Sequence, residues 1–397
     1  MKVLIVTERY WPEVGAAPSR LANMAEGMLK HGIDVDVLTG LPNYPKGEIF
    51  DEYKGSFSKS EKHNGVGIFR YWLYATVSRN PIARVLNMFS FAIIIWLFMF
   101  KFKKIKSYDK IIIQTPTLVV AASAMLLFKK LYKKTCVLNV SDIWPLTAVD
   151  MGVIKETSKS YKFLSLLERF LYRNADGILG QSQEILSHIK GFPNKNKLFL
   201  YRNLQHYSFD NECKTKSDTL KVVFSGMLGV AQDVLGIVKN VPFKQLGVEF
   251  HIFGGGKQLE EIQTWIKENP DGQVYAHGFV PKEEISKRLQ EMDVSVVPLA
   301  TRIRGAVPSK IYDTLPQGLP ILFCGGGEGA EFIKERGLGL ISDPGDYTAL
   351  EQNIKAFSEM NSEEYERISA KCFEISKNEL NFDKQMSETI DFISAIC

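Results

Sequence analysis

The sequence predicts an α/β protein made of two doubly wound, parallel-sheet domains. Its 397 residues exceed one ordinary domain and suit roughly two or three. Short apolar runs alternate with helix-like periods along the whole chain, which is the order of consecutive βαβ units. Two such sheets joined by a linker would face each other across a cleft at their carboxyl ends, where open α/β sheets bind ligands.

The strand candidates of the first half are apolar runs with helical periods between them, as in a parallel sheet. We expect strands at 2–7, 34–39, 66–71, 110–115, 135–140, 176–181 and 197–201, and helices near 17–31, 81–105, 117–132, 157–174 and 183–190. The first apolar run, Val3–Val6, is too short for a signal-peptide core of roughly 7–15 residues. A cytoplasmic location is therefore expected.

A polar, aperiodic segment at 202–219 follows and is typical of a linker. A second alternating series begins after it, with strands at 220–225, 248–253, 273–276, 293–297, 320–324 and 338–341 and helices near 231–239, 257–268, 281–291, 309–317 and 327–336. The last helices, near 346–358 and 361–395, have few strand neighbours. We expect an N-terminal domain at 1–203, a C-terminal domain at 204–375, and a terminal helix at 376–397 that packs back on the first domain.

Charge and cysteine content exclude several classes of protein. The net charge of +4 is too small for a dedicated nucleic-acid binder. The five cysteines are scattered and form no C-x-x-C motif, which argues against a disulfide framework or a Cys-rich zinc site. No metal or cofactor is expected. Asp34-Val35-Asp36 lies inside a strand, the six histidines form no close pair in the sequence, and the dinucleotide-like Gly325–Ala330 comes too late in its domain.

The segment from Val85 to Phe100 is almost wholly apolar. It is shorter than the roughly 20 residues that a bilayer crossing needs. A helix packed on a sheet would show a polar outer face, which positions 91–100 lack. Two interpretations stay open for a helix at about 85–105: it packs on the sheet, or it lies in one membrane leaflet. In the second case the flanking cations would hold anionic headgroups: Arg79, Arg84, Lys101, Lys103, Lys104 and Lys106.

Two glycine-containing loops follow strands and open helices. Without a large Cβ, a backbone can approach a ligand, and a helix N-terminus offers free N–H groups to an anion. Gly15 and Ala16 would then face a diphosphate, unless the loop is a plain strand–helix turn. Gly254-Gly255-Gly256 indicates either a close ligand or a close backbone segment.

Charged residues gather before and within the segment 305–313. Ser309 is a suitable N-cap, and Lys310 brings a cation to a positive helix terminus, which suits a phosphate. Asp313 lies one turn further on the same face and would accept ribose hydroxyls. Arg302 and Arg304 precede the segment and would bind phosphate in a two-point manner. The alternative is a surface loop with scattered charges.

Asp142 ends a strand at the predicted carboxyl edge of the first sheet, beside the aromatic Trp144. A carboxylate in that position would act as a base or bind sugar hydroxyls. The alternative is a helix-capping aspartate.

The order of elements resembles the GT-B-fold retaining glycosyltransferases of family four over nearly the whole chain, with two Rossmann-like domains. The segments that carry the resemblance are Ala25–Thr39, Arg173–Ile178, His277–Pro281 and Met292–Leu299. Four shorter segments are similar to a narrower group that includes the N-acetyl-L-fucosamine transferases of O-antigen and capsule assembly: Tyr10–Glu13, Leu41–Gly47, Asp142–Pro145 and Val307–Lys310.

The resemblance implies a metal-independent, retaining hexosyltransferase on the cytoplasmic face of the cell membrane. It implies a UDP-sugar donor and an undecaprenyl-diphosphate-linked sugar acceptor. Asp142 and Lys310 would be catalytic. The donor would contact Gly15, Ala16, Gly226, Gly254, Gly255, Val280, Arg302, Arg304, Ser309, Lys310 and Asp313, and the acceptor Glu13, Arg20, Asn43, Tyr44 and Trp144.

Several positions depart from the family pattern. The two family glutamates fall on Gly305 and Asp313, and the phosphate-binding Arg and Lys fall on Met227 and Gln232. Lys310, with Arg302 or Arg304, would then neutralise the diphosphate, and Asp142 takes the place of a common histidine base.

Two other functions are weighed against this one. One is a GT-B-type sugar-nucleotide epimerase, which needs no membrane helix and usually places histidines in its cleft, and neither condition fits this sequence well. The other is a non-catalytic sugar-nucleotide-binding partner in a capsule assembly complex, supported by the family residues lost at Gly305 and Met227.

Overall fold

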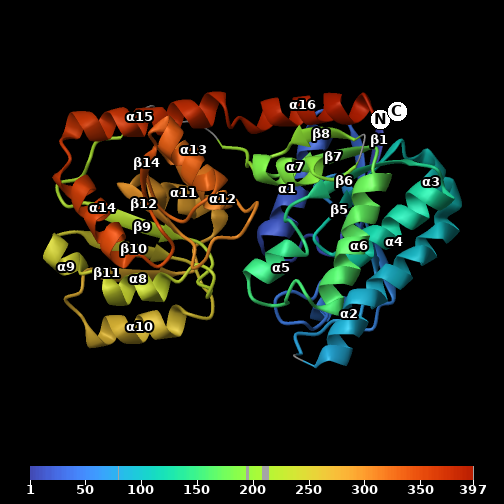
Figure 1. The fold of residues 1–397 in the computed structure, drawn as a ribbon, viewed down its shortest axis with the longest axis horizontal. Coiled ribbons are helices and arrows are strands. Elements are labelled where there is room, and N and C mark those ends of the chain that lie inside the picture. The colour runs from blue at the N-terminus through green and yellow to red at the C-terminus, as the bar shows by residue number, and fades with distance from the viewer. Residues whose placement is uncertain (79, 194–195, 208–213, 397) are drawn as a thin grey trace. The chain divides into compact units, whose positions relative to one another are not determined.

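The computed structural model describes residues 1–78, 80–193, 196–207 and 214–396, and the chain forms two compact units. Unit 1 comprises Met1–Asn203 and Phe382–Cys397, and unit 2 comprises Leu204–Asn381. Each unit has a sheet of mainly parallel strands with helices around it (Figure 1). The predicted fold class, two doubly wound α/β domains, is confirmed. Arg79 and positions 208–213 of the expected linker lie outside the described residues.

Unit 1 is built on an eight-stranded sheet in the order β3-β4-β2-β1-β5-β6-β7-β8. All neighbours pair in parallel except β3 and β4, which are antiparallel. The strands are β1 (Lys2–Val6), β2 (Asp34–Gly40), β3 (Ser58–His63), β4 (Val66–Tyr71), β5 (Lys110–Gln114), β6 (Thr135–Val140), β7 (Gly177–Gly180) and β8 (Lys197–Leu200). β3 is not predicted from the sequence, because this edge strand is polar and carries no apolar run.

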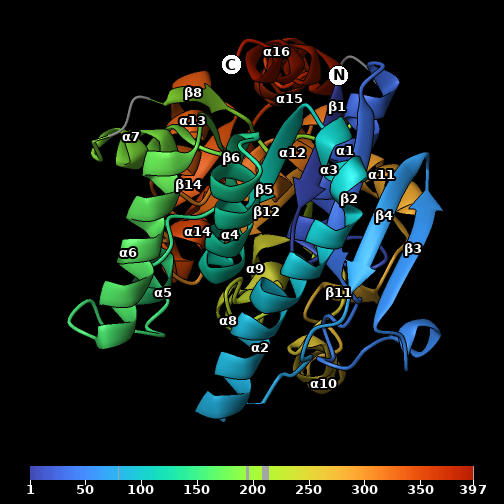
Figure 2. The same cartoon turned by 90° about the vertical axis from the view of Figure 1, so that its right-hand side faces the viewer.

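Helices cover the sheet of unit 1 and fill its core. Helices α2, α4 and α6 lie side by side over one face (Figure 2). Helix α16 packs against α1. The helices are α1 (Ala16–Lys30), α2 (Pro81–Ile94), α3 (Phe102–Ser107), α4 (Leu118–Ala124) with a π-helical continuation to Leu131, α5 (Leu146–Asp150), α6 (Lys159–Asn174), α7 (Gln183–Lys190) and α16 (Phe382–Ser394).

The apolar segment forms three helical pieces in place of the single helix expected at 81–105. Between α2 and α3 the chain tightens into η2, a 3₁₀ helix at Ile95–Lys101. One side of these helical pieces packs into the core of unit 1 through Phe91, Ile95 and Phe98, as the interpretation of a helix packed on the sheet requires. The opposite side stays apolar and exposed, with Phe100 80% accessible. Among the described residues, no helix combines the length and apolar character that crossing a bilayer requires.

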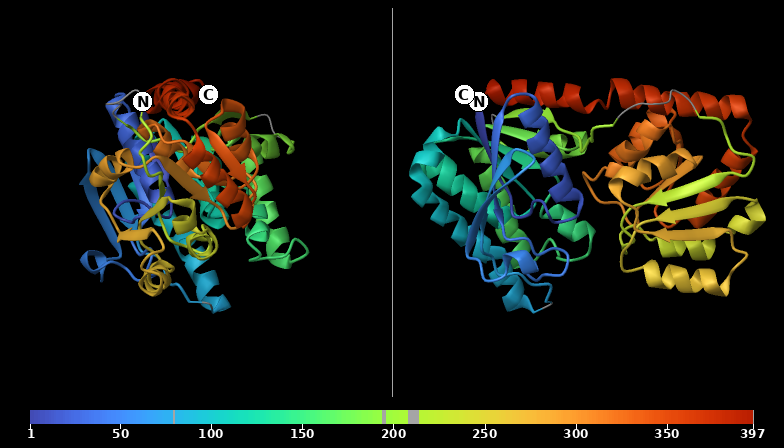
Figure 3. Two further views of the ribbon diagram at one scale, coloured as in Figure 1. Left: turned by 90° about the vertical axis from the view of Figure 1, so that its left-hand side faces the viewer. Right: turned by 180° about the vertical axis from the view of Figure 1, so that it is seen from behind.

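Unit 2 is built on a six-stranded parallel sheet in the order β11-β10-β9-β12-β13-β14. Figure 3 (right) shows this unit, coloured from yellow to red, from behind. Its strands are β9 (Lys221–Ser225), β10 (Glu249–Phe253), β11 (Val274–Gly278), β12 (Val294–Pro298), β13 (Ile321–Cys324) and β14 (Gly339–Ser342). The helices are α8 (Val234–Asn240), α9 (Phe243–Leu246), α10 (Leu259–Glu268), α11 (Lys282–Gln290), α12 (Ser309–Thr314), α13 (Glu328–Arg336), α14 (Tyr347–Glu359) and α15 (Ser362–Asn378). The helix expected at 361–395 is interrupted after Asn378, so α15 belongs to unit 2 and α16 to unit 1.

Candidate functional site

The loops that follow β1, β2, β5 and β6 share one edge of unit 1. These strands are neighbours and run in parallel, so their carboxyl ends meet there. Most of the residues predicted for the first domain follow these strands: Glu13 follows β1, Asn43 and Tyr44 follow β2, and Asp142 follows β6.

Glu13 joins two of these loops. Its carboxylate Oε1 accepts the backbone N–H groups of Asn43 and Tyr44, both at 2.8 Å. Glu13 and Asn43 are buried, and the Arg9 guanidinium lies 4.6 Å from the centre of the Tyr44 ring. Burial raises the pKa of the Glu13 carboxyl, although the two N–H groups and Arg9 oppose the shift. Glu13 therefore holds the loop after β2 against the loop after β1 from a buried position. Tyr44 remains partly accessible beside Arg9.

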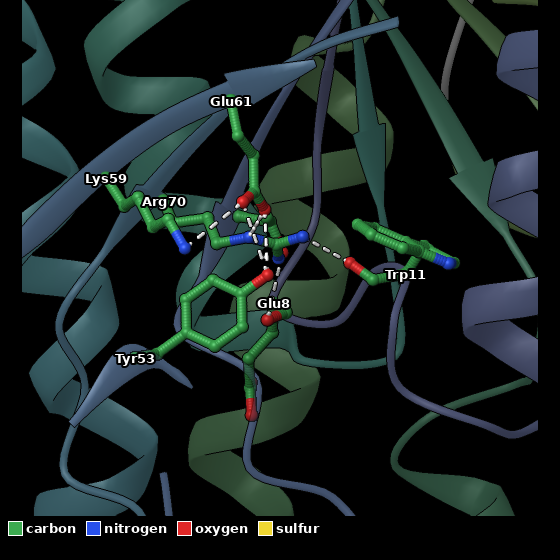
Figure 4. Close-up of polar contacts among 7 residues, drawn as sticks. Glu8, Trp11, Tyr53, Lys59, Glu61 and Arg70 are labelled. Atoms are coloured by element: carbon green, nitrogen blue, oxygen red, sulfur yellow. Dashed lines mark hydrogen bonds and ion pairs between the residues drawn. The ribbon is translucent and has the colours of Figure 1, made fainter. Parts of the chain in front are cut away.

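The loop after β1 is also held from the side of β4. Arg70 is fully buried, and its Nε donates to Glu61 on β3 at 2.5 Å while Nη2 donates to the Trp11 carbonyl (Figure 4). The Tyr53 hydroxyl donates to the same carboxylate at 3.0 Å. Sequence reasoning missed this network, although an arginine inside the apolar run 66–71 was a visible signal. The network fixes the backbone between Glu8 and Glu13.

Glu8 is a carboxyl group that the sequence analysis also missed. Its backbone carbonyl accepts the Gly40 N–H and the Thr39 hydroxyl, each at 3.2 Å, while its side chain extends away from the Arg70 ion pair (Figure 4). Burial raises the pKa of the Glu8 carboxyl, and Arg9 and a hydrogen bond with Thr117 oppose the shift.

Two predicted residues, Asp142 and Arg20, come together on unit 1. Arg20, from α1, is 6% exposed, and its Nε has no hydrogen-bond partner among the described residues. Burial raises the pKa of the Asp142 carboxyl, and the nearby Arg20 charge opposes this. Burial likewise lowers the pKa of Arg20, against the influence of Asp142 and Tyr201. The helix-capping alternative for Asp142 is wrong, because Pro145 takes the cap position of α5 and no side chain caps it.

In unit 2 the loops after β9, β10 and β11 are bonded to one another. The N–H of Gly226 donates to Phe253 O at 2.8 Å, and the N–H of Gly254 donates to Gly278 O at 2.7 Å. A Cβ on Gly254 would overlap the Gly226 carbonyl, and the φ of +144° is itself unfavourable for other residues. A close backbone, one of the two causes that the sequence left open, thus explains Gly254 and also Gly256, whose Cβ would overlap the Leu228 carbonyl. Gly255 has no atom within 4 Å of its Cβ position.

Lys310 lies against the first of these loops. Its Nζ is 2.5 Å from the position that a Cβ on Gly226 would take, and 5.6 Å from the centre of the Phe224 ring. Burial lowers the pKa of the Lys310 ammonium, and Asp313 opposes the shift. No carboxylate of the described residues lies within ion-pair distance of this nitrogen. Ser309 is not the predicted N-cap, since Pro308 takes that position and Ser309 is the first helical residue.

Asp313 is engaged by the segment that enters unit 2. Its Oδ1 accepts hydrogen bonds from Gln205 Nε2 at 2.8 Å and from the Tyr207 hydroxyl at 2.9 Å. Burial and Asp313 together raise the pKa of Tyr207 well above its ordinary value. No sequence signal marked these two donors, because they lie in a segment without periodicity.

The remaining predicted residues have mixed surroundings. Val280 packs against the small core around Phe253, Ala16 begins α1, and Trp144 packs against the main core of unit 1. Arg302 passes 3.5 Å from the Cβ position of Gly326 and is exposed. Arg304 is partly exposed, and Met227, where the family has a cation, is 49% exposed.

Two histidines form a close pair, which the sequence analysis did not expect. His251 Nδ1 lies 3.0 Å from His277 Nε2, and His251 Nε2 lies 3.0 Å from Glu249 Oε2. The residues are far apart in sequence, and only the pairing of β10 with β11 brings them together. Among the residues that the structure describes, no group of three or more potential ligands is placed to hold a metal ion.

Comparisons with known proteins match both units. A family model described as "Glycosyl transferase 4-like domain" matches residues 15–197, and one described as "Glycosyl transferases group 1" matches residues 220–359. A probable glycosyltransferase, WbjE of Pseudomonas aeruginosa, is 27% identical over 56% of this chain and 60% of its own length. The putative colanic acid biosynthesis glycosyl transferase WcaI of Escherichia coli K12 is 24% identical over 66% of this chain and 68% of its own.

Solved structures share the two-domain fold. Sucrose-phosphate synthase from Thermosynechococcus elongatus superposes with a TM-score of 0.72 at 13% identity, covering 98% of both chains. Anabaena HepE, solved in complex with UDP and glucose, superposes with a TM-score of 0.69 at 14% identity and covers 100% of both chains. At these identities the likeness concerns the fold, which is GT-B: two Rossmann-like α/β domains.

Proposed function

We propose a specific reaction for this chain, which belongs to the group 1 glycosyltransferases with the GT-B fold. The reaction is the metal-independent, retaining transfer of a sugar, N-acetyl-L-fucosamine being the first to test, from a UDP-sugar to a polyprenyl-diphosphate-linked sugar. The product would enter capsule or O-antigen polysaccharide. The observation that carries the proposal is the Lys310 ammonium against the Gly226 loop at the carboxyl edge of unit 2.

The donor would bind to unit 2. Both HepE and this chain have the same fold, and HepE was solved with UDP. In glycosyl transfer the bond from the sugar C1 to the diphosphate breaks, and negative charge develops on the departing phosphate. A cation held in a partly dehydrated site stabilises that charge more strongly than one in water. Lys310 supplies such a cation where Met227 and Gln232 supply none.

The acceptor would bind to unit 1. Its hydroxyl oxygen forms the new bond to C1 on the face that the diphosphate leaves, and its proton passes to the Asp142 carboxylate. A partly buried carboxylate with a raised pKa is a better base than an exposed one. Tyr44 and Trp144 offer aromatic surfaces at the same edge, and Arg20 holds a positive charge next to Asp142.

The lipid part of the acceptor suggests where the protein would work. Along α2 and η2, one outward stripe is apolar and exposed: Ile82, Val85, Leu86, Ile93 and Phe100. Exposed lysines follow it at Lys101, Lys103 and Lys106. An apolar stripe beside cations is the pattern of a helix that lies on an anionic leaflet. We therefore propose that this stripe docks on the cytoplasmic leaflet, where the lipid-linked acceptor is found.

A panel of UDP-sugars with an undecaprenyl-diphosphate-linked sugar acceptor tests the reaction. Formation of an extended lipid-linked product supports the proposal, and Lys310→Ala should lower its rate by an order of magnitude or more. Interconversion of the UDP-sugar without an acceptor would identify an epimerase. Binding of UDP-sugars without turnover of any donor would favour a non-catalytic partner. Near-normal turnover of the Lys310→Ala variant would remove Lys310 from the mechanism.

A further inference from the structure

The segment that leads into unit 2 carries polar groups aimed at one carboxylate. Gln205 and Tyr207 lie within a few residues of Leu204, the first residue of unit 2. Both donate to the same atom, Asp313 Oδ1, at 2.8 and 2.9 Å. Two donors that converge on one carboxylate oxygen fix the plane and direction of the side chain, because each bond is strongest along a lone pair.

Only one of the two polar atoms of the Gln205 side-chain amide has a hydrogen-bond partner among the described residues. Its Nε2 donates to Asp313, but its Oε1 has no hydrogen-bond partner among the described residues and no accessible surface. A buried carbonyl oxygen without a donor is unfavourable. A ligand hydroxyl that reaches Oε1 would supply the missing donor, and Nε2 would keep its bond to Asp313. The amide oxygen and the Asp313 carboxylate therefore form a pair of acceptors in close proximity.

A pair of neighbouring acceptors complements two neighbouring hydroxyl donors. A vicinal diol on a five-membered ring presents such a pair, and each hydroxyl can donate to one acceptor. Lys310 precedes Asp313 on the same helix and lies against the Gly226 loop. A ligand with an anionic group at Lys310 and a diol at Asp313 has the chemistry of a nucleotide.

We infer that Gln205 and Tyr207 belong to the ribose subsite of unit 2. Tyr207 is a positioning residue that orients Asp313, and Gln205 both orients Asp313 and supplies a second acceptor for the ribose diol. The inference rests on the proposed function, since it assumes a nucleotide-linked donor. It makes the first residues of unit 2 part of the nucleotide site, so ligand binding would also restrain the segment that contains Gln205 and Tyr207.

Calorimetry of the full chain with UDP, 2′-deoxy-UDP and 3′-deoxy-UDP tests the inference. The unaltered protein should bind UDP about tenfold or more tightly than at least one deoxy analogue, because a hydrogen bond to a charged acceptor is lost. Gln205→Leu and Tyr207→Phe should reduce that ratio to about twofold. Tyr275, on β11, donates its hydroxyl to Gln273, and Tyr275→Phe should keep the ratio of the unaltered protein.

The ratio is measured within each variant, so a general loss of stability changes both affinities and leaves the ratio unaffected. If UDP binds but both variants keep the full ratio, the inference is wrong and the proposed donor stands. If UDP and UDP-sugars do not bind at all, the proposed donor and the inference fail together. Hydrogen exchange gives a second readout: UDP should slow exchange of the backbone amides at 202–207 in the unaltered protein, and Tyr207→Phe should weaken that protection.

Discussion

Lys310 lies so close to the Gly226 backbone that a Cβ on Gly226 would stand 2.5 Å from its Nζ. The amine reaches this loop only because residue 226 has no side chain. The carboxyl edge of unit 2 therefore keeps a cation beside an unobstructed backbone. Among the described residues no carboxylate forms an ion pair with this cation, so its charge is available to an anionic ligand.

Replacing Lys310 by methionine should stabilise the fold while weakening UDP binding. The pKa of Lys310 is lowered by burial, so the charged form is disfavoured in the folded chain. That penalty is fully present below the lowered folded pKa and disappears as the pH rises past the ordinary value near 10.5. The gain in thermal stability from Lys310→Met should thus be largest near neutral pH and shrink toward alkaline pH. Melting curves from pH 7 to pH 10.5 measure it, and a gain that grows with pH would contradict the account.

Gly254→Ala should destabilise unit 2, and Gly255→Ala should not. An alanine Cβ at position 254 would overlap the Gly226 carbonyl oxygen in a strained backbone conformation, whereas position 255 is open. A forced φ of this kind costs about 1–3 kcal/mol before any shift of the neighbouring loop. Thermal melts of the two single variants compare neighbouring residues with the same added atom. Equal stability of the two variants would show that the loop accommodates the Cβ.

The charges of Arg20 and Asp142 should depend on each other. Removing one leaves the other buried without its partner, which is more damaging than removing both. In a double-mutant cycle with Arg20→Met and Asp142→Asn, the coupling energy of unfolding should fall at about 0.5–3 kcal/mol. Urea unfolding of the four proteins provides the measurement. If the two single-mutant changes in unfolding free energy add up to the double-mutant change, the two charges do not interact.

The outer stripe of α2 should bind anionic lipid without contributing to the core. Ile93→Asp places a charge on a side chain that is 66% exposed, so it should abolish flotation with vesicles of phosphatidylglycerol and leave the melting temperature nearly unchanged. Ile95→Ala is the matched control, since Ile95 is fully buried. It should cost about 2–5 kcal/mol of stability and leave flotation intact. If the Ile93→Asp variant floats with the vesicles as well as the unaltered protein does, the outer stripe of α2 is not the lipid-binding surface.

The strands are the most predictable part of the fold. In a parallel sheet the inner strands are buried on both faces, so each is a continuous apolar run in the sequence. Every such run is predicted to be a strand. The edge strand at Ser58–His63 escaped because its exposed face requires polar residues, the same composition that a loop has. The break after Asn378 was likewise hidden, since the helical pattern continues across it.

The contacts within the candidate sites were less predictable than the residues themselves. The sequence predicts Asp142 and Lys310 as site residues from their places after a strand and at the start of a helix. The contact of Asp142 with Arg20 and that of Asp313 with Gln205 are not predicted, although Arg20 itself is. Arg20 lies on α1 and Gln205 in an aperiodic segment, and only the tertiary fold brings each near its partner. The His251–His277 pair depends in the same way on strand pairing that no local pattern reveals.

The hydrogen bond from Arg70 to the Trp11 carbonyl spans 59 positions of the chain. The loop after β1 therefore cannot reach its final shape when β1 and α1 first form; it must wait until the β3–β4 hairpin has added to the sheet and brought Arg70 and Glu61 into place. Folds dominated by contacts between residues far apart in the sequence form more slowly than folds with mostly local contacts. β3 carries no part of the candidate site, yet the site becomes complete during folding only after this strand has joined the sheet. Pulsed hydrogen exchange should show that the amides at 9–11 are protected no earlier than those of β3.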